Sequence, residues 1–283
     1  MHHFQLHAFR GLVAIAISLL SYNPSAVAQP AAKGPIKALL ITGGCCHNYK
    51  FQAQALTEGI NKWAPADPEV AAKVSALRLG SSLPGSDKRA VVEWTIVNEG
   101  GTGTKAQIGL YSSPDWAKPY DVIIHNECFA DTDDADYIRR ITAAHKAGKP
   151  ALVIHCAMHT YRAWKSDDWR EFLGVTSRHH EHQSRYPVRI VAPEHPIMKG
   201  IWSSWTTPMD ELYVIEKLWP TAKALAVSKS EKTGQEQPVV WANNYYGTRV
   251  FGTTYGHSDD TFGDPVFIDL LARGFFWAAG TIK

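Results

Sequence analysis

The chain has 283 residues, of which 45% are hydrophobic and 20% are charged, a composition typical of a globular protein rather than a disordered or fibrous one. Its 29 lysine and arginine residues nearly balance its 27 aspartate and glutamate residues, so the chain lacks the basic excess of a nucleic-acid-binding protein. Beyond the N-terminal segment, no apolar run reaches the roughly 20 residues that a membrane-spanning helix needs.

Residues 1–28 have the pattern of a secretory signal peptide. Arg10 supplies the positive charge, residues 11–20 supply the apolar stretch, and Ala26-Val27-Ala28 forms a small-residue cleavage site. A membrane anchor is the alternative, but the apolar stretch is short for one. Residues 29–35 are expected to form a flexible leader. The sequence therefore predicts an exported protein, periplasmic or extracellular, that has no membrane association once the signal is removed.

Short apolar runs alternate with helical patterns from residue 36 onward. Residues 36–42 form an apolar run that ends at Gly43-Gly44, which is typical of a buried strand, and residues 50–63 have helical spacing. The region 100–114 is expected to be a loop with a short extended piece. Further strands are predicted over 91–97, 121–125 and 151–155, and further helices over 131–147 and 167–173.

The second half of the chain is richer in predicted strands. A hairpin turn at 245–248 leads into a strand over 249–255, and Asp264 and Pro265 are the N-cap and first residue of an apolar helix over 265–279. The other strands are predicted over 188–191, 211–215, 224–227 and 239–242. Strands that alternate with helices predict one α/β domain over 36–281, with a parallel sheet and helices on both faces.

The predicted strand ends carry the side chains that are suited to chemistry. Ligands of open α/β sheets bind outside the carboxyl ends of the strands, so groups that follow different strands are expected to meet there. The groups are Cys45, Cys46 and His47 after the first strand; His125, Glu127 and Cys128 at the third; His155, Cys156 and His159 at the fourth; and His257, Asp259 and Asp260 after the last.

Histidine is the main candidate for catalysis at this edge. Imidazole titrates near neutral pH, which favours general acid–base roles for His155, His257 and His159, with Glu127 beside them. The same histidines could instead bind a divalent metal such as zinc, with Asp210 or Glu211 as a carboxylate ligand, although no HExxH motif fixes their spacing.

Cysteine offers a second chemical interpretation. Cys156 could act as a nucleophile with His159 or His257 as its base, but the sequence around it lacks the glycines of a sharp nucleophile elbow, and an inert buried cysteine is the alternative. The four cysteines contain no CxxC pair. Their places at strand ends predict one or two disulfides that brace the site, and adjacent Cys45 and Cys46 are not expected to pair with each other.

Several residues are candidates for substrate binding. They are His47, Tyr161, Trp164 and Glu211. Aromatic side chains near loops can pack against the apolar face of a sugar, whereas core packing is the alternative for most of them, including Trp202, Trp205 and Trp241. Residues 178–182 (RHHEH) are expected to form a polar loop that lines the mouth of the site or holds a surface metal. The GxGxxG and GxxxxGK[ST] motifs are absent, so no nucleotide cofactor is expected.

Together these segments make the chain similar to a known family. The segments are 43–47 (GGCCH), 125–129 (HNECF), 154–161 (IHCAMHTY), 194–197 (EHPI), 210–213 (DELY), 252–257 (GTTYGH) and 273–279 (RGFFWAA). Their order and spacing resemble those of the ThuA-like, or trehalose utilisation, family. The resemblance implies a flavodoxin-like, class I glutamine amidotransferase-like fold and a link to the catabolism of disaccharides or keto-sugars. The amidotransferase triad is not expected, because the elbow glycines and a His-x-Glu segment are missing.

Two functions follow as hypotheses. The first is an enzyme that hydrolyses, cleaves by elimination, or isomerises a sugar or 3-keto-sugar, with His155 and His257 as the central pair. The second is a non-catalytic sugar-binding or envelope interaction module. The expected partner in both cases is a small sugar or sugar derivative, and a homo-oligomer is compatible with either.

Overall fold

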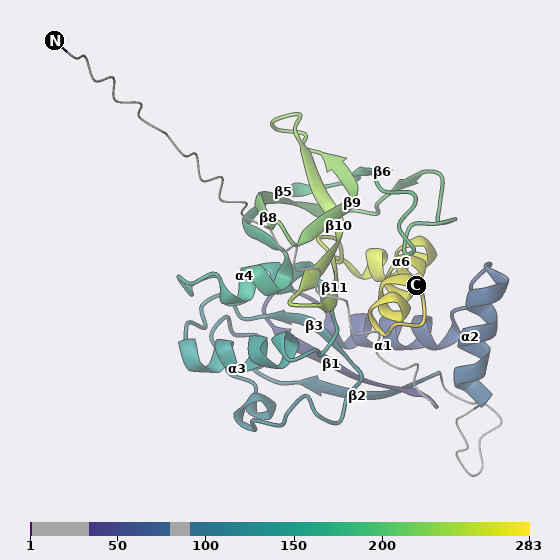
Figure 1. Cartoon of the computed structure of the whole chain (residues 1–283), viewed down its shortest axis with the longest axis horizontal. Helices are drawn as coiled ribbons and strands as arrows, with labels where there is room; N and C mark the ends of the chain where they lie inside the picture. Colours follow the sequence, from purple (N-terminus) through teal and green to yellow (C-terminus); the bar gives the residue numbers. More distant parts are fainter. Residues whose placement is uncertain (2–33, 80–90) are drawn as a thin grey trace.

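The computed structural model describes Met1 and residues 34–79 and 91–283 (Figure 1). The expected signal peptide and nearly all of the expected leader lie outside these residues. Within the described part of the chain, no helix is long and apolar enough to cross a membrane.

A nine-stranded sheet organises the molecule, with the strand order β2-β1-β3-β4-β11-β10-β9-β6-β7. Strands β2, β1, β3, β4 and β11 run parallel, and this 2-1-3-4-5 pattern is the flavodoxin-like order, so the predicted α/β fold class is confirmed. These strands are β1 (Ile36–Gly44), β2 (Val92–Asn98), β3 (Val122–Cys128), β4 (Ala151–Ile154) and β11 (Thr248–Thr253).

The remaining strands are antiparallel. Strand β10 pairs with β11 and then β9, β6 and β7 continue the sheet, whereas β5 and β8 form a separate two-stranded ribbon. Figure 1 places this ribbon beside the antiparallel part of the sheet. These strands are β5 (Val175–Ser184), β6 (Pro187–Ile190), β7 (Trp205–Thr206), β8 (Asp210–Leu218), β9 (Ala222–Lys229) and β10 (Glu236–Tyr245).

Helices cover both faces of the parallel strands, because every second side chain of a buried strand points to the opposite face. Ala38 and Leu40 of β1 face the core that holds α1 and α6, and Leu39 and Ile41 face the core that holds α3 and α4. The helices are α1 (Tyr49–Lys62), α2 (Pro68–Leu79), α3 (Ala135–Lys146), α4 (Asp168–Leu173), α5 (Asp259–Gly263) and α6 (Pro265–Ala278), with 3₁₀ turns η1 (Gly109–Ser112) and η2 (His155–Met158).

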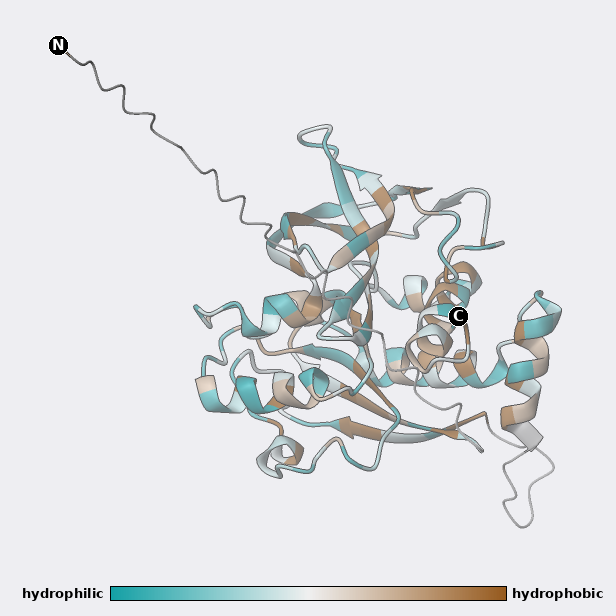
Figure 2. Cartoon of the chain, in the orientation of Figure 1, coloured by the Kyte–Doolittle hydropathy of each residue, from teal (hydrophilic) through white to brown (hydrophobic). Residues whose placement is uncertain are grey.

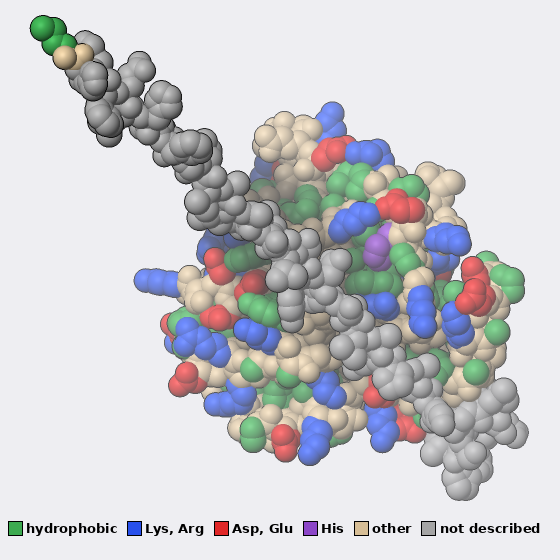
Figure 3. Space-filling model, in the orientation of Figure 1, with side chains coloured by type: hydrophobic (Ala, Val, Ile, Leu, Met, Phe, Trp, Pro, Cys, Tyr) green, Lys and Arg blue, Asp and Glu red, His purple; other side chains and the backbone are tan. Residues whose placement is uncertain are grey.

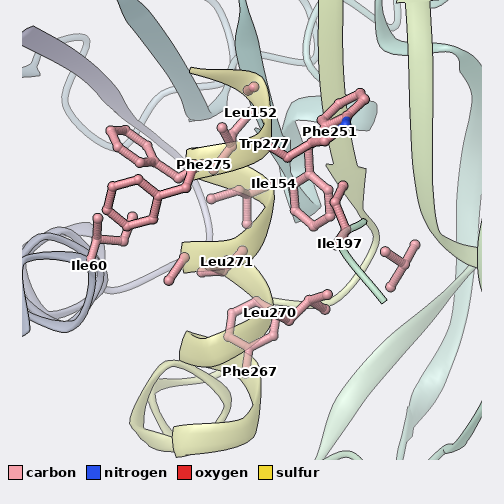
Figure 4. Packing of buried hydrophobic residues seen from close by; sticks show 14 of the residues in the cluster. Ile60, Leu152, Ile154, Ile197, Phe251, Phe267, Leu270, Leu271, Phe275 and Trp277 are labelled. Atoms are coloured by element: carbon pink, nitrogen blue, oxygen red, sulfur yellow. The ribbon is translucent and has the colours of Figure 1, made fainter. Parts of the chain in front are cut away.

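Helix α6 is the most apolar helix of the fold, as its brown colour in Figure 2 shows. Asp264 caps it by accepting a hydrogen bond from Val266, as the sequence predicts. Leu270, Leu271 and Phe275 are fully buried, and Figure 4 shows this helix packed among side chains from β4, β11 and α1. Its burial on nearly all sides ties the last segment of the chain to the sheet.

Most predicted elements are present, with ends shifted by a few residues, but residues 178–182 are a correction. They belong to strand β5 and not to a loop. The segment is polar because its two faces meet the site and the solvent, so it has no apolar alternation to reveal a strand. Helix α2 and the short helix α5 were not predicted. Strand β3 ends at Cys128, three residues after the predicted end at residue 125.

Candidate functional site

Three histidines meet at the carboxyl edge of the parallel strands. His47 follows β1, His155 follows β4 and His257 follows β11, and one ring nitrogen of each lies within 4.8 Å of the corresponding nitrogens of the other two. The closest pair is His47 Nε2 and His257 Nδ1, which are 3.3 Å apart. His155 is buried, while His47 and His257 are partly exposed, so the cluster reaches solvent on one side. We call these three residues the imidazole cluster.

The backbone under the imidazole cluster is held in unusual conformations. His155 has a φ of +47° and Cys46 has a φ of +86°, values that non-glycine residues seldom adopt and that cluster at functional sites. Gly256 makes room for this turn, because a Cβ atom there would lie 3.3 Å from the Cβ of His155 and its own φ is +129°. The sharp turn after β4 therefore carries a histidine where an α/β hydrolase would carry its nucleophile.

Hydrogen bonds fix the ring of each histidine. His155 donates from Nδ1 to the carbonyl of Thr254 at 2.6 Å, so its Nε2 is the unprotonated nitrogen of the neutral ring. Tyr49 donates its hydroxyl to the carbonyl of Cys45, so it accepts from His47 Nδ1 at 3.3 Å. The Gln183 amide lies 2.7 Å from His257 Nε2. The nitrogens that face the centre are thus His47 Nε2, His155 Nε2 and His257 Nδ1.

The ribbon of β5 and β8 adds a carboxylate and a phenol to the imidazole cluster. Glu211 Oε2 lies 3.6 Å from His155 Nε2 and Glu211 Oε1 lies 3.4 Å from His257 Nδ1. His180 of β5 approaches the same carboxylate at 3.6 Å. The hydroxyl of Tyr213 lies 3.3 Å from His155 Nε2. Glu211 and Tyr213 are two residues apart on β8, so they share the face that covers the cluster.

Burial keeps the rings neutral. Burial, followed by the neighbouring His257, lowers the pKa of His47 to about 4. Burial also lowers the pKa of His155 well below its usual value, with His47 as the next cause. Both imidazoles are therefore unprotonated at neutral pH, and each is able to accept a proton or bind a cation.

Two residues of the predicted metal set, His159 and Asp210, lie outside the imidazole cluster. The ring of His159 stacks on Tyr213 with centroids 4.0 Å apart, and its Nε2 lies 3.0 Å from Ser177 Oγ. Burial lowers the pKa of His159 to about 3. His159 fails to join because the η2 turn directs it to the opposite side of Tyr213. His47, expected to bind substrate, takes its place in the cluster.

Asp210 lies outside the imidazole cluster and binds the main chain next to it. Its buried carboxylate accepts hydrogen bonds from the backbone of Glu211, Gly256 and His257 and from the hydroxyl of Thr261. Burial raises the pKa of Asp210 to about 7, against these hydrogen bonds, which lower it. Apart from the bond from Glu211, these hydrogen bonds come from the segment that carries His257, so Asp210 positions that histidine.

Glu127 and His125 form a second buried network, outside the imidazole cluster. His125 Nδ1 lies 2.9 Å from Glu127 Oε1, and His125 Nε2 lies 3.0 Å from His145 Nε2, whose other nitrogen donates to the Lys149 carbonyl. His125 also packs edge-on against Trp169. Because β3 runs on to Cys128, His125 is an interior strand residue that points into the core beside α3 and α4.

The expected aromatic platform is also corrected. Tyr161 is buried against Tyr137 and Trp169, so its face is closed to a sugar. Trp164 contacts Asp168 and Arg139 beside α3 and α4. Trp205 and Trp241 are buried and Trp202 is partly buried, as the core-packing alternative predicts.

The four cysteines lie directly beneath the imidazole cluster. They form two disulfides, Cys45–Cys46 and Cys128–Cys156, and the described residues include no free cysteine. The expectation of disulfides at the site agrees with this arrangement, whereas the expectation that Cys45 and Cys46 would not pair is wrong. A cysteine in a disulfide is no nucleophile, so the structure also removes Cys156 as a catalytic thiol.

A thiol assay tests the cysteine pairing. We expect no free thiol in the denatured, unreduced protein and four after reduction, because each cysteine has a partner. Peptide mapping by mass spectrometry under non-reducing conditions should find Cys128 and Cys156 in one linked peptide pair. A link between Cys45 and Cys128, whose sulfur atoms lie 3.8 Å apart, would contradict the arrangement.

Sequence reasoning missed Tyr213, Gln183 and Tyr49 as parts of the site. Tyr213 could have been found from its place two residues after Glu211 on a predicted strand, since alternate strand residues share a face. The other two had no signal: Gln183 lies in the segment interpreted as a loop, and Tyr49 contacts His47 only because of the turn into α1.

Comparisons with known proteins agree with the fold and the segments described above. A sequence model of the family described as ThuA, trehalose utilisation, matches residues 106–278. A ThuA-like protein of Parabacteroides merdae superposes with a TM-score of 0.64 at 20% identity, over 87% of this chain and 90% of that one. A ThuA-like protein of Bacteroides uniformis superposes with a TM-score of 0.60 at 17% identity, over 88% and 94%. None of the curated proteins compared with the sequence matches it.

Proposed function

Because the chain belongs to the ThuA, or trehalose utilisation, family, we propose that it is an exported enzyme of carbohydrate catabolism that acts at the imidazole cluster. Its substrate is a disaccharide or a 3-keto-sugar derivative, and the reaction is a hydrolysis, an elimination or an isomerisation. The observation that carries the proposal is the meeting of three imidazole rings with one carboxylate and one phenol at the carboxyl edge of the parallel sheet.

The chemistry of this arrangement suits proton transfer at a carbon beside a ketone. His155 Nε2 accepts the proton, since its Nδ1 is fixed on the Thr254 carbonyl. The Tyr213 hydroxyl, 3.3 Å from the same nitrogen, donates a hydrogen bond to the oxygen on which negative charge develops. Burial raises the pKa of Tyr213 well above its usual value, so the phenol keeps its proton for this role.

The surface is consistent with a small neutral ligand. Acidic and basic side chains are interspersed over the face seen in Figure 3, and the whole chain carries a net charge of only +2.

A substrate screen tests the proposal. The purified protein is incubated with a panel of disaccharides and their 3-keto derivatives, while products are followed by mass spectrometry and binding by calorimetry. We expect turnover of at least one keto-sugar or disaccharide. Binding without conversion would contradict the enzyme and support the alternative, a non-catalytic sugar-binding or envelope interaction module. Neither binding nor conversion would contradict both.

A further inference from the structure

The three inner nitrogens of the imidazole cluster can each offer a lone pair to a cation between them. The outer nitrogen of His47 donates a hydrogen bond to Tyr49, and that of His155 donates to the Thr254 carbonyl. The inner nitrogen of each ring therefore carries a lone pair. The side-chain nitrogen of Gln183 lies 2.7 Å from His257 Nε2. A half-turn of this amide exchanges its oxygen and nitrogen, so that the oxygen accepts a hydrogen bond from His257 Nε2. His257 Nδ1 then carries the third lone pair. Hydrogen bonds to the outer nitrogens are the usual way in which proteins orient metal-binding histidines.

The spacing of these nitrogens fits one metal ion. Two nitrogens that are each bound to a tetrahedral zinc ion lie about 3.4 Å apart, given metal–nitrogen distances of about 2.0–2.1 Å. His47 Nε2 and His257 Nδ1 are 3.3 Å apart, and the third nitrogen, on His155, lies within 4.8 Å of both.

The charge around the cluster points to the same ligand. Glu211 has His155, His180 and His257 as its ion-pair partners within the described residues, and burial favours the neutral form of the first of these rings. A nearly buried carboxylate whose ion-pair partners among the described residues are histidines, with no lysine or arginine, is stabilised by a divalent cation beside it.

The sulfur atoms near the cluster are not available to the ion. Two further sets of closely spaced ligand atoms occur among the described residues, Cys45, Cys46 and Cys128 in one and His47, Cys128 and Cys156 in the other. Both rely on sulfur atoms that are held in disulfides. Only the histidine set offers free lone pairs throughout.

We propose that His47, His155 and His257 bind one divalent transition-metal ion, with Glu211 beside its remaining coordination position. Imidazole nitrogens suit zinc, iron(II), cobalt(II) and nickel(II), and three protein ligands with an open position are typical of a catalytic rather than a structural ion. Such an ion polarises a ketone oxygen or activates a bound water. With the ion bound, His155 Nε2 is a ligand, and the adjacent Glu211 carboxylate takes its place as the proton acceptor. The proposal stands apart from the carbohydrate assignment, because metal binding is measured without any sugar.

Metal titration of the full-length protein tests the site. The protein is produced without a polyhistidine tag, treated with a chelator in buffer that contains no reductant, and titrated with Zn²⁺ by calorimetry and with Co²⁺ by visible absorption. We expect one ion per chain. His47→Ala and His257→Ala should each weaken binding by at least about 100-fold, and Gln183→Ala by about 10–100-fold, because it removes only the support of a ligand.

A matched control separates this site from adventitious binding. His182→Ala removes an exposed histidine that lies nearby but outside the cluster, and it should leave the affinity within about threefold. Circular dichroism verifies that each variant is folded. The proposal is overturned if the wild-type protein binds neither ion at micromolar concentrations, or if His47→Ala and His257→Ala bind as tightly as the wild type. A protein that binds the ion and converts no sugar would overturn the proposed function alone.

Discussion

Replacement of His155 by asparagine is expected to reduce kcat by roughly 10²–10⁴-fold on any sugar that the wild-type protein converts. Nε2 of His155 is the nitrogen nearest to the Tyr213 hydroxyl and faces the centre of the cluster. Asparagine is preferred to alanine because it tolerates the positive φ of +47° at this position. Steady-state kinetics and circular dichroism, measured on the same preparation, give the result.

His182→Ala is the matched control for this variant. His182 lies on β5 near the site, but its exposed side chain pairs with Glu231 at 2.8 Å, and a surface pair of this kind contributes little to stability. We expect its kcat to stay within about twofold of the wild type. A folded His155→Asn protein with more than a third of the wild-type kcat would refute the assignment of His155.

Phe275→Ala is expected to lower the free energy of unfolding by about 3–5 kcal/mol, the range for emptying a buried aromatic site. Phe275 is fully buried on α6, where its ring packs against Trp94 and Phe276. Figure 4 shows its place in the cluster between α6 and the sheet. Urea denaturation followed by tryptophan fluorescence measures the change.

Phe51→Ala provides the comparison on the same side-chain type. Phe51 lies on α1 with 38% of its surface exposed, and alanine has the higher helix propensity, so the loss should be about 1 kcal/mol or less. Equal losses in the two variants would mean that α6 is not the buried element described above.

The sequence was sufficient for most of the fold, because its strands are apolar runs with glycine or polar ends. Segment 36–42 and helix 265–279 were predictable from local pattern and capping alone. Strand β5 was not, because its pairing partner β8 is distant in sequence and its side chains are polar on both faces. Nonlocal pairing leaves no trace in a local hydrophobic pattern.

The sequence predicted where the candidate site lies, but it did not predict all of the residues that form it. The rule that strand ends meet at one edge brought His47, His155 and His257 together correctly. It failed for His125, since an error of three residues in the end of β3 turns a rim residue into a core residue. It also failed for His159, because the direction of a side chain after a strand depends on the turn, which spacing does not reveal.

The two disulfides determine which donor atoms this edge of the sheet can present. Cys46 immediately precedes His47, and Cys156 immediately follows His155, so each cross-link immobilises the main chain beside one imidazole. Oxidation during folding thereby preorganises the rings before anything binds. It also withdraws soft thiolate donors that would otherwise compete for copper(I) or zinc, and it leaves nitrogen and oxygen as the coordinating atoms. The redox state of the compartment in which the chain matures thus selects the kind of inorganic chemistry open to it.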